Sequence, residues 1–236
     1  MSQLEVIKKE LGQVSSPERA RNSQRYFKTG PGEYGEGDEF IGATMPQQRE
    51  IAKKYLGIDL KSIQNLLNSR IHEERMVGLL ILTYKFPKAD ESEKNEIFDF
   101  YLRNTQRINN WDLVDVTAPK IVGEYLLDKD RKVLIKLAGS ELLWDRRIAI
   151  IATATFIDNG EYEWTFRLTE MLIEDSEDLI HKATGWMLRE VGKRCGEDIE
   201  VEFLDRYASK MPRTMLRYAI ERFTPQLRRA YLQGNR

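Results

Sequence analysis

The sequence predicts an all-α protein, and two observations carry that prediction. After residue 47 the chain is a succession of helical periodicities separated by short turns, with few alternating strand-like runs and with Gly or Pro mostly at the joints. The predicted helices also carry a small or compact residue on the buried face at intervals of 36, 35, 36 and 34 residues. These residues are Gly78, Val114, Ala149, Gly185 and Ala219. A spacing near 35 accommodates two helices and two turns, and because the TPR signature is absent, the pattern favours a HEAT-like solenoid of helix pairs.

Length and composition are those of an ordinary globular chain. The 236 residues, 41% of them hydrophobic, can bury a full core and suit one elongated domain or two compact ones. We expect a single HEAT-like domain over residues 1–236. No apolar run approaches the ~20 residues that span a bilayer, and the N-terminus "MSQLEVIKKELGQVSS" is too polar and too acidic for a signal or transit peptide. A cytoplasmic monomer that does not bind membranes is therefore expected.

Cysteine and histidine are scarce. Cys195 is the only cysteine, which excludes an internal disulfide, and His72 and His181 are the only histidines. This content argues against a Cys/His metal site and leaves little for Ser-His-Asp chemistry. We expect neither a metal nor a cofactor.

The first distinctive segment is "GPGEYGEGDEF", which predicts a Gly-rich loop at about residues 29–39. It is a poor match to a phosphate-binding loop because no Lys-Ser/Thr follows it. Three of its acidic residues, Glu33, Glu36 and Asp38, would also repel phosphate.

The segment "NNWDLVDVTAPKIVG", residues 109–123, places a tryptophan and two aspartates on an otherwise apolar helix. Trp111 and Asp115 are separated by four residues and lie about 40° apart on one face, whereas Asp112 lies about 60° further round, where it caps the helix or faces solvent. Pro119 cannot donate to the carbonyl of Asp115, so the helix should bend or start anew there.

The inner helices of a curved solenoid line its concave face, which we expect to be basic. Charged and aromatic residues recur on equivalent turns of the aligned helices, and they would form a row of positive charge for a nucleic-acid backbone. They are Arg75, Trp111, Asp112, Asp115, Arg146, Arg147, Lys182, Trp186, Arg189, Arg213 and Arg217. Each cation taken alone also fits a solvated helix end.

The formal net charge of −1 hides an asymmetry along the chain. Residues 206–236 hold eight basic residues and one acidic residue, a local balance of +7, so the rest of the chain has a balance of −8. Such polarity suits a protein that meets phosphates on one surface. A solvated basic helix end explains the same count.

Four residues fall on the same face of three successive repeats: Trp111, Asp115, Arg147 and Trp186. Considered singly, Trp111 could be a packing residue and Asp115 an ion-pair partner of Arg147. Together, two indole faces and a carboxylate suit a flat, cationic ligand. DNA offers one when a purine is alkylated on a ring nitrogen, and stabilising the oxocarbenium-like cation that forms as the base departs would be sufficient for catalysis.

These segments, with "LLWDRRIAIIAT", "HKATGWMLREVGKR", the upstream "RYFKTGPGEYGEGDEFIGATMPQQR" and the downstream "MPRTMLRYAIERF", resemble the AlkD-like DNA alkylation repair family of HEAT-like DNA glycosylases. The resemblance covers nearly the whole chain. It implies an active cleft formed by the residues of the W-x-x-x-D, W-x-x-R and G-W-x-L-R-E segments, here Trp111, Asp115, Arg147 and Trp186. It also implies excision of positively charged N3- and N7-alkyl purines from double-stranded DNA without flipping the base into a pocket.

The same resemblance places DNA contacts outside the cleft. Tyr26 matches an aromatic residue that approaches the DNA in the family, whereas Thr44 stands where a glutamine is common. With the basic residues above, the expected DNA-binding set is Tyr26, Arg146, Lys182, Arg189, Arg213 and Arg217.

Two other functions remain open. One is a non-catalytic HEAT-like module that binds damaged or branched DNA, and the other is a protein-binding scaffold. Asp115 distinguishes the first of these from a glycosylase, because a protein that only binds DNA has no need of a carboxylate that opposes phosphate.

Overall fold

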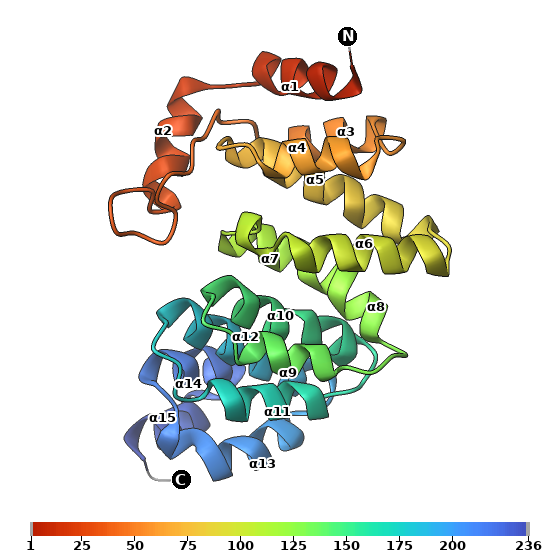
Figure 1. Cartoon of the computed structure of the whole chain (residues 1–236). Helices are drawn as coiled ribbons and strands as arrows, with labels where there is room; N and C mark the ends of the chain where they lie inside the picture. The colour runs from red at the N-terminus through yellow and green to blue at the C-terminus, as the bar shows by residue number, and fades with distance from the viewer. Residues whose placement is uncertain (1, 235–236) are drawn as a thin grey trace. The chain divides into compact units, whose positions relative to one another are not determined.

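The computed structural model describes residues 2–234, and its regular elements in that range are helices (Figure 1). One isolated β-bridge joins Glu39 to Ile71. The all-α prediction is confirmed. The chain divides into two compact units, the first ending at Thr117 and the second beginning at Ala118.

The first unit holds seven α-helices among the described residues, and the last of them extends one residue past the boundary. They are α1 (Gln3–Gln13), α2 (Pro17–Tyr26), α3 (Met45–Lys54), α4 (Leu60–Leu67), α5 (His72–Lys85), α6 (Glu91–Arg103) and α7 (Trp111–Ala118). Short 3-10 helices follow α5 and α6, at Phe86–Lys88 and Thr105–Arg107. Side-chain caps fix several helix starts: Asp59 accepts from the Ser62 amide and Asp90 from the Glu93 amide.

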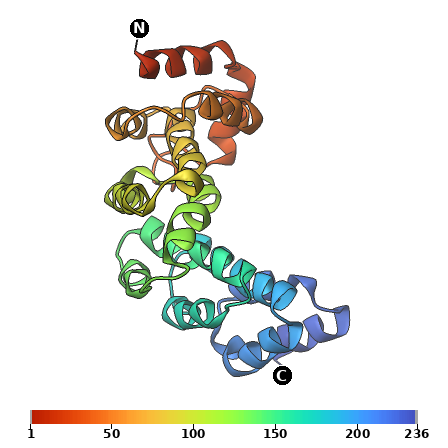
Figure 2. The same cartoon turned by 90° about the vertical axis from the view of Figure 1, so that its right-hand side faces the viewer.

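The second unit begins just before the π-helix Pro119–Gly123 and continues with α-helices and two short 3-10 helices, Ala208–Lys210 and Ile220–Arg222. The α-helices are α8 (Glu124–Leu126), α9 (Lys132–Ala138), α10 (Leu143–Asp158), α11 (Glu163–Leu172), α12 (Asp178–Arg194), α13 (Glu197–Tyr207), α14 (Arg213–Ala219) and α15 (Pro225–Gln233). Helices α9 and α11 pack together, as do α10, α12 and α14, so this unit has two layers of helices (Figures 1 and 2).

The predicted repeat corresponds to real helices. Its small or compact residues are all buried, one in each of α5, α7, α10, α12 and α14. Three of these helices, α5, α10 and α12, pack on the helix that precedes them in the chain, α4, α9 and α11. Gly185 shows why a small residue is needed: a Cβ there would collide with the Met215 carbonyl and lie 2.6 Å from Cβ of Tyr218, so α12 and α14 approach closely only with glycine.

The helix was expected to bend or start anew at Pro119, and the structure shows a change of helix type there, with no interruption of the helical backbone. The α-helical pattern of α7 ends at Ala118, and one π-helical turn follows. The Thr155 hydroxyl donates to the Pro119 carbonyl at 2.7 Å, which satisfies a backbone acceptor at the irregular turn.

Candidate functional site

Trp111, the first residue of α7, is half-buried against three side chains of the first unit. The Phe27 ring stacks on it with centroids 5.2 Å apart and planes at 24°, and the Tyr26 ring meets it edge-on at 5.8 Å. The indole Nε1 donates to the Tyr34 hydroxyl at 3.3 Å. Helix α2 and the Gly-rich loop therefore both hold the indole that the sequence predicts to be catalytic.

The ring packing continues inward from Phe27. Phe27 and Phe40 stack at 5.0 Å, Phe40 and His72 at 4.5 Å, and Phe27 and His72 lie 5.3 Å apart. We refer to Phe27, Phe40, His72 and Trp111 as the aromatic cluster. It joins α2, the loop, α5 and α7 within one unit.

His72 is also the centre of a buried ionic network and is only 2% exposed. Its Nδ1 lies 3.2 Å from Oδ2 of Asp38, and its Nε2 lies 2.8 Å from Oδ2 of Asp112. Burial by itself would lower the pKa of His72, but the charge of Asp112 and the hydrogen bonds to both carboxylates outweigh burial and raise that pKa above its ordinary value. Two ring N–H groups facing two carboxylates is the arrangement of an imidazolium.

Asp38 is held by a second cation. Nη2 of Arg75 lies 2.7 Å from Oδ2 of Asp38. Burial would raise the pKa of Asp38, but the hydrogen bond from His72 and the charge of Arg75 together lower it. The network fastens the end of the Gly-rich loop to α5 and to the first turn of α7.

Two sequence-based expectations are wrong at this point, the second of them in part. Arg75 was expected on a basic surface, yet it is 3% exposed, paired with Asp38 and bonded to the carbonyls of Ser69 and Arg70. Asp112 was expected to cap the helix or face solvent: its Oδ1 does accept from the Leu113 amide in the first turn of α7 at 2.9 Å, but its Oδ2 meets His72 and not solvent. In both cases an opposite charge from a segment distant in sequence stabilises the side chain away from solvent, because a buried charge needs such a partner.

Sequence reasoning missed His72, because the two histidines were considered only for a metal site or a Ser-His-Asp arrangement. Its two carboxylate partners lie 34 and 40 residues away, so no local spacing indicates them. Within the described residues no group of three or more His, Cys, Asp or Glu side chains is placed to hold a metal ion.

The other predicted catalytic residues lie on α7, α10 and α12. Asp115 is half-buried on α7, one turn after Trp111. Arg147 is buried on α10 and donates through Nη1 to the carbonyl of Leu179, in the first turn of α12. Trp186 is half-buried on α12, and its Nε1 donates to Glu190 at 3.3 Å. The structure thus places Trp111 with Asp115 and, separately, Arg147 on the helix that packs against α12; the grouping of all four in one cleft remains a prediction.

The predicted DNA-binding residues of the second unit differ in how many ion pairs and hydrogen bonds they already make within the protein. The Arg146 guanidinium is bound to Asp175 at 2.6 Å and to the carbonyls of Ser140 and Glu141, both at 2.9 Å. Lys182 pairs with Asp178 at 2.6 Å, and Arg189 pairs with Glu221.

The last two members of the predicted set are more open. Arg213 is exposed and donates to the Leu232 carbonyl at 2.7 Å, which leaves part of its guanidinium available. Arg217 is exposed and has no hydrogen-bond or ionic partner among residues 2–234. Of the predicted set, Arg217 is the one most available to a phosphate.

Helix α2 contributes basic residues that the sequence analysis did not single out. Arg21 and Arg25 are exposed and one turn apart, and their guanidinium groups have no partner in the described part of the chain. Tyr26, which was predicted to approach DNA, follows them and is 67% exposed. No residue of α2 is buried, and this lack of an apolar stripe was the signal available from the sequence.

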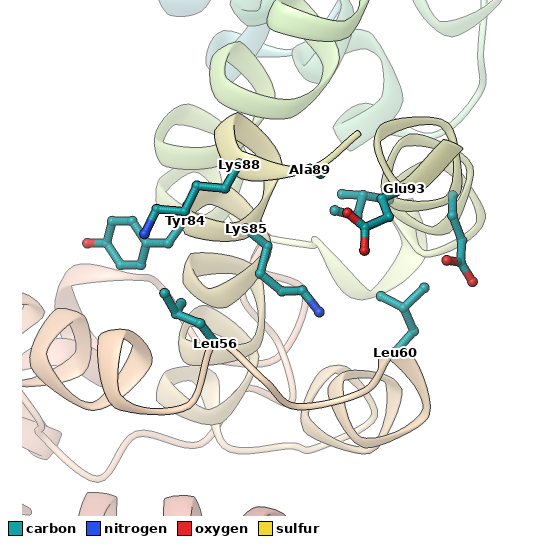
Figure 3. A pocket seen from close by; sticks show the side chains of 9 residues that line it. Leu56, Leu60, Tyr84, Lys85, Lys88, Ala89 and Glu93 are labelled. Atoms are coloured by element: carbon teal, nitrogen blue, oxygen red, sulfur yellow. The ribbon is translucent and has the colours of Figure 1, made fainter. Parts of the chain in front are cut away.

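A separate hollow of about 240 Å³ lies at the C-terminal end of α5 (Figure 3). Leu56, Leu60 and Ile97 line it together with lysine and glutamate side chains, and Lys85 donates to the carbonyl of Ile58 at 3.2 Å. None of the predicted site residues borders it. No helix within residues 2–234 has the length and apolar character to cross a bilayer.

Comparison with known proteins agrees with the family that the sequence segments resemble. Residues 7–223 match the family model described as DNA alkylation repair enzyme. Among solved structures, a predicted DNA alkylation repair enzyme from Enterococcus faecalis shares the fold with a TM-score of 0.70 at 16% sequence identity, over 89% of this chain and 97% of that one. No curated protein matches the sequence.

Proposed function

Because the chain belongs to the DNA alkylation repair enzyme family, we propose that it is a DNA N-glycosylase that excises positively charged N3- and N7-alkylated purines without flipping the base. The observation that carries the proposal is the setting of Trp111, whose indole is held by Phe27, Tyr26 and Tyr34 and is followed one turn later by the Asp115 carboxylate. An oriented aromatic face and a carboxylate both attract a cation.

The reaction needs little more than these groups, because the positive charge of the alkylated base already makes it a good leaving group. As the bond from the sugar C1′ to the ring nitrogen breaks, the bonding electron pair moves to the base, which departs neutral, and the sugar becomes an oxocarbenium-like cation. Water then adds to C1′ and loses a proton to solvent. Asp115 would stabilise the sugar cation, which is the role of a preorganised charge in a transition state.

The proposed DNA contacts fall into two groups. Tyr26, Lys182, Arg213 and Arg217 would meet the backbone, to which we add Arg21 and Arg25 on α2. Arg146 and Arg189 are paired with carboxylates and their side chains are only 14% and 21% exposed, against 39% for the paired Lys182, so we propose that they support the contact surface. Phosphate contacts of this kind position a duplex and carry no sequence information.

The test is release of free base from a duplex that holds a single N7-methylguanine or N3-methyladenine, measured under single-turnover conditions. We expect the methylated base in solution and an abasic site in the strand. A protein that binds the methylated duplex and leaves the base attached at the rate of the enzyme-free control would be the non-catalytic DNA-binding module instead.

The remaining parts of the proposal concern the state of the protein. We propose one HEAT-like domain over residues 1–236, acting as a monomer in the cytoplasm in base excision repair. Sedimentation equilibrium at micromolar concentration tests the monomer, for which the expected mass is 27.7 kDa.

A further inference from the structure

A cavity of about 330 Å³ lies within the first unit beneath α2. Two hydrogen bonds hold the start of α2 beside it: the Ser16 amide donates to the Ile41 carbonyl at 2.8 Å, and Nε of Arg19 donates to the Gly42 carbonyl at 2.6 Å. No residue of α2 is buried. The wall residues that matter to its chemistry are Asn22, Ser23, Phe27, Phe40, His72 and Asp112.

The charges that border this cavity are balanced within the protein. His72 lies between the carboxylates of Asp38 and Asp112. The Glu73 carboxylate accepts from the amides of Ile41 and Gly42, at 3.1 and 2.7 Å. The wall carries two cations, Arg19 and His72, and two carboxylates, Glu73 and Asp112, so its charges offset one another and favour neither an anionic nor a cationic ligand. The cavity therefore suits a neutral molecule.

The groups that remain for a ligand are aromatic rings and uncharged polar side chains. Phe27, Phe40 and His72 contribute rings. The Asn22 amide and the Ser23 hydroxyl have no side-chain hydrogen bond to any other described residue. An amide and a hydroxyl can both donate and accept, so they match a flat heterocycle with amino and ring-nitrogen groups on its edge. Ligand pockets begin at a volume of about 300 Å³, and this cavity is close to that lower limit. It therefore fits a base and leaves little room for the sugar and phosphate of a nucleotide.

We infer that this cavity holds the free alkylpurine after its bond to the sugar has broken. The inference rests on the proposed function, because that reaction converts a cationic base into a neutral one. The positive charge of the substrate base favours its binding beside Trp111 and Asp115, and the neutral product base lacks that attraction. Phe27 stacks on Trp111 at 5.2 Å and also lines the cavity, so a neutral purine leaving the indole reaches the cavity by passing one ring.

The experiment is a calorimetric titration of free 3-methyladenine and 7-methylguanine into the full chain without DNA. We expect saturable binding, weakened at least ten-fold in Asn22→Leu and in Ser23→Leu, because each change replaces a polar group with a bulkier apolar one. Gln24→Leu is the matched control, an exposed residue on the same helix that does not line the cavity. Circular dichroism melting checks that all three variants fold.

Two results would overturn the inference: wild-type protein that does not bind free base, or binding that persists in both cavity variants. Base release from methylated duplex is measured beside the titration, so the two proposals fail separately. Release without free-base binding removes the cavity assignment and leaves the glycosylase. Free-base binding without release contradicts the glycosylase and the product role together.

Discussion

At the scale of single residues, Asp115 separates catalysis from binding. Asp115→Asn keeps size and hydrogen-bonding capacity and removes the charge, so we expect base release to slow by about 10²–10³-fold, as when one preorganised electrostatic group is lost. Affinity for undamaged duplex should stay level or rise, because a carboxylate near phosphates is repulsive. Single-turnover release and a binding titration measure the two effects.

The matched control for Asp115→Asn is Asp99→Asn, an exposed aspartate on α6 of the same unit. It should leave both measurements at wild-type values. A wild-type release rate in folded Asp115→Asn would remove this carboxylate from the mechanism and favour the DNA-binding module.

His72 gives the second prediction at this scale, a dependence of stability on pH. The pKa of His72 is raised in the folded protein, so its contribution is fully present below the unfolded value of about 6.5 and is lost as the pH rises through the folded pKa. His72→Gln should therefore be less stable than wild type at pH 6, by about 3 kcal/mol for a broken buried ion pair, and the difference should shrink at alkaline pH.

Thermal melts recorded at steps of about half a pH unit between pH 5 and pH 10 measure this dependence. His181→Gln, in the second unit, serves as the control and should keep the wild-type loss of stability on the alkaline side. Parallel curves for wild type and His72→Gln across the whole range would show that the imidazolium does not link Asp38 to Asp112.

At the scale of helices, the contact of α12 with α14 depends on Gly185. Gly185→Ala adds a methyl group that meets the Met215 carbonyl, so the helices must separate, and we expect a loss of about 1–3 kcal/mol in the free energy of unfolding. This outweighs the gain of up to ~1 kcal/mol from the better helix propensity of alanine. Gly12→Ala on α1, where a Cβ meets no atom within 4 Å, is the control and should stabilise the protein. Urea denaturation measures both, and equal stabilisation would contradict the close packing.

The helices also show how far sequence alone could go. Periodicity and a spacing near 35 predicted the buried helices that carry Gly78, Val114, Ala149, Gly185 and Ala219, because burial of one face leaves a regular trace in the sequence. The missing proline amide likewise predicted that the α-helical hydrogen-bond pattern would be disturbed at Pro119, where a π-helical turn begins. These features leave a regular pattern in the sequence, either within a helix or from one repeat to the next.

The polar contacts of the candidate site could not be predicted in the same way. Asp38, His72 and Asp112 come from a loop and two helices, and their pairing depends on how those elements pack. A helical pattern indicates which face is buried but does not indicate which charge meets which. For this reason Arg75 was expected at the surface although it is buried on Asp38. The aromatic cluster around Trp111 escaped notice on the same grounds.

At the scale of the whole molecule, the proposal requires cationic residues of both units to engage one duplex. Arg25 lies on α2 in the first unit and Arg217 on α14 in the second, and both are exposed without a partner among the described residues. Each phosphate contact releases about one counterion, so Arg25→Ala and Arg217→Ala should each lower the slope of log K against log salt by about one. Affinity should fall similarly for duplexes of any sequence.

The double variant tests whether the two contacts belong to one complex. If both arginines meet the same bound duplex at separate phosphates, their effects should add, and the slope should fall by about two. Arg213→Ala should resemble Arg217→Ala, whereas Arg146→Ala should lower the melting temperature with little change in slope, because its guanidinium is bound to Asp175 and two carbonyls. Fluorescence anisotropy at five salt concentrations gives the slopes. An unchanged slope in the double variant would make these arginines ordinary surface charge and would confine the DNA contact to other residues.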